Sequence, residues 1–115
     1  MNKKIGEIIR EIRNKKGISL RRLAEIVNVS NVNILYIEKG KINTSLPILK
    51  GIAKALNYNI DKLLALADMI DDDIRNIINK RPILITNFLR AAKNLTNDDW
   101  NILTKQVLNM NSKVS

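Results

Sequence analysis

Residues 19–40 read SLRRLAEIVNVSNVNILYIEKG, with two serines eleven residues apart. Ser19 and Ser30 each stand where a side-chain oxygen can accept a hydrogen bond from a backbone N–H of a first helical turn. Asn28 lies between the two serines, and asparagine tolerates a positive φ better than other non-glycine residues. The stretch therefore predicts two short helices joined by a tight turn, over residues 20–27 and 30–39.

Helical patterns continue on both sides of this stretch. Before it, isoleucines spaced three and four residues apart predict a helix over residues 3–16, which ends at Gly17. After it, Ser45 and Asn59 are expected to cap a fourth and a fifth helix. Five short helices with short connections predict a compact all-α domain over residues 1–66.

The remaining residues, 67–115, are interpreted as a short C-terminal helical segment. The three consecutive aspartates 71–73 favour the positive N-terminal end of a helix, and Pro82 ends that helix. Another helix is expected around residues 85–92. A last one follows Thr96, which resembles the start of a capping box. A segment of this size cannot hold a core alone, so we expect it to pack on something.

The charge of the chain is distributed unevenly. The formal net charge is +9, and the sequence pI is about 10.0. Residues 1–66 carry 13 basic and five acidic side chains, whereas residues 67–115 carry seven and six. Nearly all of the excess therefore lies in the first segment, as expected if that segment contacts a polyanion.

The residue inventory excludes several classes of site. The chain has no cysteine and no histidine, which excludes a disulfide framework, a thiol or imidazole nucleophile and a Cys/His zinc site. It also has no glycine-rich phosphate loop, so we expect neither enzymatic activity nor a cofactor. Aspartates 71–73 diverge by about 100° per residue on a helix and are not expected to bind a metal. No targeting or membrane-spanning segment is visible, so we expect a cytoplasmic protein.

Residues 19–40 resemble the helix-turn-helix of lambda-repressor-like regulators, of the Cro-type or xenobiotic-response-element family. The resemblance extends from about Ile5 to Leu66. It implies that the third helix enters the major groove of double-stranded DNA while the second crosses the phosphate backbone. The matching positions are Ser19, Leu23, Ala24, Val29, Ser30, Ile34, Ile37, Glu38 and Gly40.

The resemblance and the helical periodicity together nominate side chains that read bases. At 100° per residue, Ile34 and Ile37 define the buried side of the third helix, and the candidates lie away from it or on its flank. Asn31 can pair bidentately with adenine and Val32 suits a thymine methyl, which favours half-sites containing A·T pairs. The base-reading candidates are Ser30, Asn31, Val32, Leu35 and Tyr36.

Polar and basic side chains around the third helix are candidates for phosphate contacts. They are Ser19, Arg21, Arg22, Asn33, Lys39, Lys41 and Asn43. The family commonly has glutamine after the serine cap, but this chain has Leu20, so one phosphate contact is lost and Arg21 can replace it. The resemblance implies a different role for Arg13 and Glu38, which are expected to form a structural ion pair between the first and third helices.

Three questions stay open at the level of sequence. The residues at positions 32, 35 and 36 are expected to be exposed together, and such an apolar patch usually contacts a partner. That partner is the DNA groove, a C-terminal helix or a second copy of the chain. Residues 67–115 form a homodimer, dock another protein such as an antagonist or toxin, or brace the first domain. The favoured function is a dimeric transcriptional repressor. The alternative is an antitoxin-type or adaptor protein whose main partner is another protein.

Overall fold

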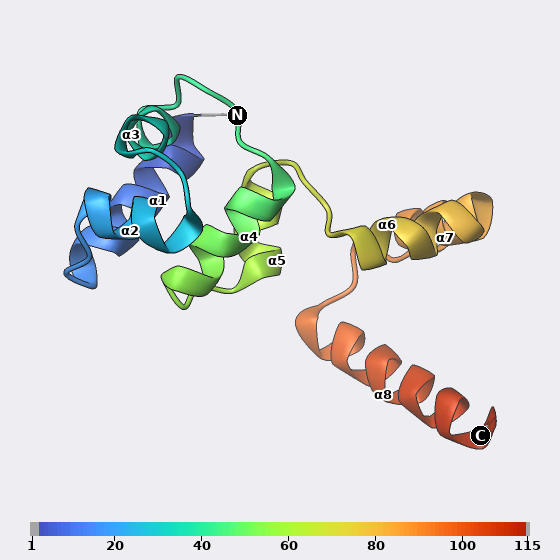
Figure 1. The fold of residues 1–115 in the computed structure, drawn as a ribbon. Helices are drawn as coiled ribbons and strands as arrows, with labels where there is room; N and C mark the ends of the chain where they lie inside the picture. Colours follow the sequence, from blue (N-terminus) through green and yellow to red (C-terminus); the bar gives the residue numbers. More distant parts are fainter. Residues whose placement is uncertain (1–2, 115) are drawn as a thin grey trace. The chain divides into compact units, whose positions relative to one another are not determined.

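The computed structural model describes the backbone of residues 3–114 and the side chains of residues 4–112. The described chain is helical throughout, with no strand, and this confirms the all-α prediction. In chain order the helices are α1 (Lys3–Lys15), α2 (Leu20–Val27), α3 (Asn31–Glu38), α4 (Leu46–Ala55), α5 (Ile60–Leu66), α6 (Asp72–Lys80), α7 (Pro82–Ala91) and α8 (Asn97–Val114) (Figure 1).

Serine caps and a left-handed asparagine shape the region around α2 and α3. The Ser19 hydroxyl accepts a hydrogen bond from the backbone N–H of Arg22 at 3.0 Å, and the Ser30 hydroxyl accepts one from that of Asn33 at 3.1 Å. Asn28 has a φ of 58° and closes the turn between the helices. The local signals in the sequence therefore act as predicted, because each satisfies a backbone group that a helix end leaves unpaired.

The core is aliphatic and receives side chains from each of α1 to α5. Its fully buried members come from every one of these helices: Ile5, Ile9, Leu23, Ala24, Ile34, Ile37, Leu49, Ile52, Ala53, Leu56, Leu63 and Leu64. The apolar spacing of three and four places them on one face of each helix. These five helices surround one hydrophobic core, and that core holds α3 in place.

A glycine allows α1 and α3 to approach closely. A Cβ atom added at Gly6 would fall on the carbonyl oxygens of Ile37 and Glu38, at the last turn of α3. Glycine is otherwise unfavourable inside a helix by about 1 kcal/mol relative to alanine. The backbones therefore meet here at a distance that no residue with a side chain allows.

Contacts divide the chain into two compact units, one ending at Arg75 and the next beginning at Asn76. Among the described residues of the second unit, Ala92 is the one buried apolar side chain, with 5% of its surface exposed. Phe88 and Trp100 pack edge to face, with ring centroids 6.3 Å apart. None of the described helices has the length and apolarity needed to cross a membrane.

Candidate nucleic-acid interface

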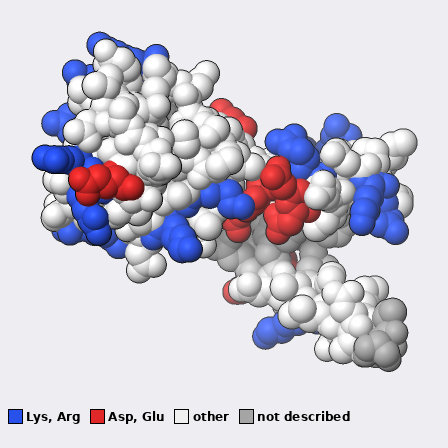
Figure 2. All heavy atoms as spheres, in the orientation of Figure 1, with Lys and Arg blue, Asp and Glu red and all other residues white. Residues whose placement is uncertain are grey.

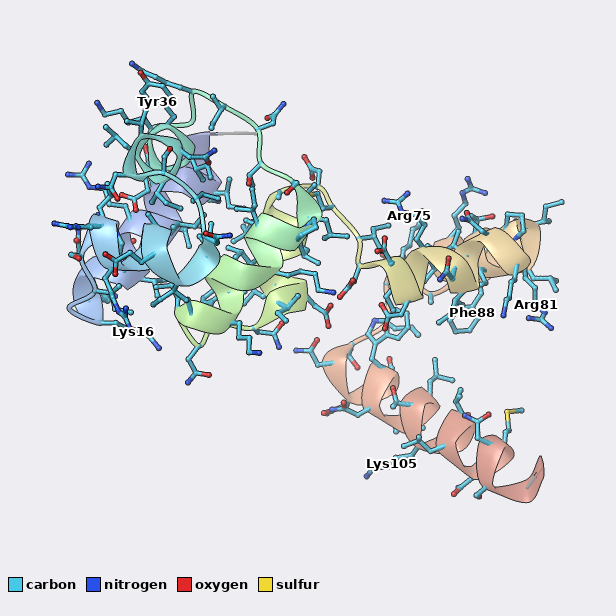
Figure 3. All side chains as sticks on the ribbon, viewed as in Figure 1. Lys16, Tyr36, Arg75, Arg81, Phe88 and Lys105 are labelled. Atoms are coloured by element: carbon cyan, nitrogen blue, oxygen red, sulfur yellow. The ribbon has the colours of Figure 1, made fainter. Side chains whose placement is uncertain are left out.

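One side of α3 is anchored in the core and the other is open. Ile34 and Ile37 are fully buried, and they fix the rotation of the helix about its axis. Val32 and Tyr36 lie away from this side, with 53% and 40% of their surfaces exposed. Figure 3 shows Tyr36 on the outer side of α3. An exposed face of a short, rigidly seated helix suits insertion into a groove.

Leu35 differs from the expectation that it is exposed beside Val32 and Tyr36. It is half-buried, as is Asn33, whereas Asn31 and Lys39 are exposed. A long helical side chain lies back over the preceding turn, so its angular position alone does not determine its exposure. The open apolar surface of α3 is therefore narrower than the helical periodicity indicates.

Lys41 is held against α3 by two contacts with Tyr36. Its backbone N–H donates a hydrogen bond to the Tyr36 carbonyl oxygen at 2.9 Å. Its ammonium group lies 5.7 Å from the centroid of the Tyr36 ring, within range of a cation–π interaction. Gly40, with a φ of 71°, reverses the chain between them. Lys41, a candidate phosphate ligand, is thus held against Tyr36, a candidate base reader. The sequence alone did not indicate this contact.

The candidate phosphate contacts on α2 are exposed and weakly engaged. Arg21 and Arg22 approach the carboxylate of Glu25 at 3.6 and 3.5 Å. Exposed pairs of this kind contribute about 0–1 kcal/mol, so both guanidinium groups remain able to bind another anion. Ser19, Lys39, Lys41 and Asn43 are also exposed. Figure 2 shows Lys and Arg side chains around the rim of the body that α1–α5 form.

Arg13 and Glu38 form a buried, bidentate ion pair between α1 and α3. The Arg13 Nε donates to one carboxylate oxygen at 2.7 Å, and its Nη2 donates to the other at 3.0 Å. Arg13 also donates to the carbonyl oxygen of Ile18 at 3.0 Å, which fixes the loop before α2. These contacts occupy the guanidinium group inside the protein. The pair positions α3 and is not available to DNA.

A second ion pair, between Lys50 and Asp71, was not predicted from the sequence. The Lys50 ammonium donates to Asp71 Oδ1 at 3.0 Å, and the backbone N–H of Asp72 donates to the same oxygen at 2.8 Å. The Lys50 hydrogen bond, followed by that of Asp72, lowers the pKa of Asp71, and the partner carboxylate raises the pKa of Lys50. Asp71 lies directly before α6, and its carboxylate connects the first residue of α6 to Lys50 of α4. The described residues hold no cluster of three metal-binding side chains.

Comparison with known proteins places the site in a family. The Helix-turn-helix family model matches residues 9–63. A helix-turn-helix-type transcriptional regulator of Archaeoglobus fulgidus, itself uncharacterised, is 40% identical over 60 residues, which are 52% of this chain and 86% of the relative. The competence pilus inhibition repressor of Acinetobacter baylyi is 32% identical over 69 residues, 60% of this chain; the match spans 63% of that repressor, less than two thirds of its length.

Solved structures show the same fold. The restriction-modification controller protein C.AhdI of Aeromonas hydrophila aligns with a TM-score of 0.50 and 32% identity, over 52% of this chain and 91% of its own. The SinR–SinI complex aligns with a TM-score of 0.51 over 94% of this chain and 98% of the matched chain, and its 20% identity shows likeness of fold alone.

Proposed function

The chain belongs to the helix-turn-helix transcriptional regulators, and we propose that it is a dimeric repressor that reads DNA sequence with α3. The observation that carries this proposal is the open face of α3, which is held rigidly by buried Ile34 and Ile37 and bordered by unpaired or weakly paired cations. A helix seated in this way can enter the major groove without losing its own packing.

Base reading is assigned to the first turns of α3 and to Tyr36. The side-chain amide of Asn31 is exposed and offers the donor and acceptor pair that matches N6 and N7 of adenine. Val32 offers a branched apolar surface to a thymine methyl group. Ser30 and Leu35 complete the candidate set, with Leu35 contributing the smaller surface because it is half-buried. This combination favours operators that contain A·T pairs.

The phosphate contacts supply affinity that does not depend on sequence. Arg21 and Arg22 reach from α2, and Lys39, Lys41 and Asn43 from the end of α3 and the following loop. The hydroxyls of Ser19 and Ser30 accept capping hydrogen bonds and keep a proton to donate. Asn33, which is half-buried, has only part of its side chain available. Two copies on half-sites about 34 Å apart would double these contacts and block a promoter that overlaps the operator.

Titration with salt tests the proposal. Selection from random duplexes first identifies a site, and fluorescence anisotropy then follows its binding at increasing salt. We expect the selected consensus to be palindromic. We also expect log affinity to fall with log salt at a slope of about −0.9 for each phosphate contacted. Absence of duplex binding at low salt would overturn the proposal.

An adaptor or antitoxin whose main partner is a protein is the second candidate function. It is favoured by the exposed apolar side chains of α7, including Ile83 and Leu84. The same titration separates the two candidates, because a protein adaptor has no duplex binding to lose at high salt.

A further inference from the structure

Glu25 is the one exposed acidic side chain of the basic stretch that forms α2 and α3. Between residues 12 and 60 the sequence has two acids, Glu25 and Glu38. Glu38 is buried and paired with Arg13, whereas 53% of the Glu25 side chain is exposed. Figure 2 shows acidic atoms over α2 with Lys and Arg side chains on either side. Because a carboxylate repels phosphate, the charge of Glu25 opposes DNA binding at this surface.

The Glu25 carboxylate contacts both arginines of α2. Arg21 Nε lies 3.6 Å from its Oε1, and Arg22 Nη1 lies 3.5 Å from its Oε2. Arg21 and Arg22 precede Glu25 by four and three residues, the two spacings that make side chains neighbours on the surface of a helix. Each oxygen of the carboxylate therefore faces a different guanidinium group.

These three charged side chains lie on the side of α2 that faces away from the core. Leu23 and Ala24 are the buried residues of α2, and the helical periodicity places Arg22 and Glu25 roughly opposite to them. Any polyanion that α2 crosses therefore meets the two arginines together with the carboxylate that holds them.

We propose that Glu25 competes with DNA phosphate for Arg21 and Arg22, and so limits the affinity of the protein for every duplex. The carboxylate faces N–H groups that a phosphate oxygen would accept from, so an arginine must leave Glu25 to bind a phosphate. The carboxylate left behind attracts a cation from solution, which offsets one of the counterions that the DNA releases. This competition rests on the proposed function, since it takes α2 to lie against the phosphate backbone.

Glu25→Gln removes the charge and keeps the shape of the side chain. Glu11→Gln is the matched control, because Glu11 is also exposed and forms a pair within one helix, 3.7 Å from Lys15. It lies two residues before Arg13 and hence on the opposite side of α1 from the contact with α3. Both variants change the net charge of the full chain equally. Their binding to the selected duplex and to a duplex of unrelated sequence is followed by fluorescence anisotropy at several salt concentrations.

We expect Glu25→Gln to raise the affinity for both duplexes about 3- to 10-fold, the range of two exposed ion pairs, and to make the salt slope steeper by up to about one. Glu11→Gln should stay within about 2-fold of the parent. An unchanged or lower affinity in Glu25→Gln, or an equal gain in both variants, would overturn the proposal.

A background that lacks both arginines separates competition from direct repulsion. When Arg21 and Arg22 are both replaced by alanine, Glu25→Gln should gain less than half as much affinity as it does in the parent, because no guanidinium group is left to release. A gain of the same size in that background would show that Glu25 acts on the DNA directly, and the competition would be refuted.

Titration with inorganic phosphate keeps this outcome separate from the proposed function. NMR follows the Nε–H resonances of Arg21 and Arg22 in the full chain, and we expect phosphate to bind about 2- to 3-fold more tightly in Glu25→Gln than in the parent. If it does so but no variant binds a duplex, the DNA-binding proposal fails and the competition stands. If duplexes bind but neither phosphate nor duplex affinity responds to Glu25→Gln, the competition fails and DNA binding stands.

Discussion

At the scale of single residues, the contact between Tyr36 and Lys41 links a candidate base reader to a candidate phosphate ligand. A lysine after a helix is ordinarily a mobile charge, but the ring of Tyr36 and the hydrogen bond to its carbonyl oxygen hold Lys41 beside α3. Restricting a cation before binding lowers the entropy lost when it meets a phosphate. Tyr36 is therefore a positioning residue for Lys41 in addition to a candidate base reader.

Removing the Tyr36 ring should weaken this restriction. We expect Tyr36→Leu to reduce affinity about 2- to 5-fold on a duplex of unrelated sequence, which corresponds to the free energy of an exposed cation–π contact, and to make the salt slope shallower by up to about one. On the selected site the loss should be larger, because Tyr36 is also a candidate base reader. Tyr36→Phe keeps the ring and should keep the slope. Anisotropy titrations at several salt concentrations measure both effects. In a Lys41→Ala background the slope should no longer respond to Tyr36→Leu; a persisting response would refute the coupling.

Asn31 and Arg21 should differ in what their loss changes. Asn31→Ala is expected to cost about 1–3 kcal/mol on the preferred site and to relax preference at one base pair. Arg21→Ala should instead weaken binding on all sequences alike, because a phosphate is the same at every step. Competition against duplexes with single base-pair changes distinguishes these results. Identical behaviour of the two variants would show that base and phosphate contacts are wrongly assigned.

At the scale of elements, the seating of α3 depends on a close approach to α1. Gly6→Ala would bring a methyl group onto backbone carbonyl oxygens, which cannot move without shifting α3. We expect a loss of roughly 1–3 kcal/mol in the free energy of unfolding, measured by urea denaturation. Gly51→Ala is the control, since its Cβ would lie 3.3 Å from a Val27 methyl group that can move. That change should be neutral or stabilise by up to about 1 kcal/mol. Equal effects at both glycines would contradict this account.

The pair of Lys50 and Asp71 makes the start of α6 sensitive to pH. The pKa of Asp71 is lowered, so its contribution to stability is complete above the ordinary value of 3.8 and is lost as pH falls through the lowered value. The pKa of Lys50 is raised, so its contribution is lost only as pH rises above the ordinary 10.5. The pair should therefore be intact across neutral pH. NMR titration of the Asp71 carboxyl and of the Asp72 amide should show one transition below pH 3.8, and Asp71→Asn should abolish it.

The elements themselves follow from local signals, and the contacts between them do not. Serine caps, Asn28 and the apolar spacing act within a few residues, so each helix of the described chain, α1 to α8, was predicted from the sequence. The need for glycine at position 6 depends on the backbone at the end of α3. The role of Asp71 depends on its ion pair with Lys50 of α4. Leu35 is half-buried although its angular position on α3 predicts exposure. Such features depend on residues distant in the chain, which periodicity does not represent.

At the scale of the whole molecule, the division of charge does not follow the division of contacts. Residues 1–75 carry 14 basic and nine acidic side chains, whereas residues 76–115 carry six and two, so both units have a basic excess. The candidate phosphate ligands all lie in the unit that ends at Arg75, which also contains the aliphatic core. Beyond it, apolar side chains are exposed along α7 and α8. A net charge of +9 alone indicated only an anionic partner. The fold separates the candidate phosphate ligands and the core from the exposed apolar side chains of α7 and α8, and the net charge does not show that separation.

This separation predicts how a shortened chain behaves. A chain ending after Arg75 keeps α1–α5, their core and the Lys50–Asp71 pair, so it should fold cooperatively, as urea denaturation will show. It should be monomeric and bind the operator with about half the salt slope of the full chain, because one copy contacts half of the phosphates. A shortened chain that still forms dimers would instead place the pairing surface within α1–α5, and the exposed face of Val32 and Tyr36 would then be its first candidate.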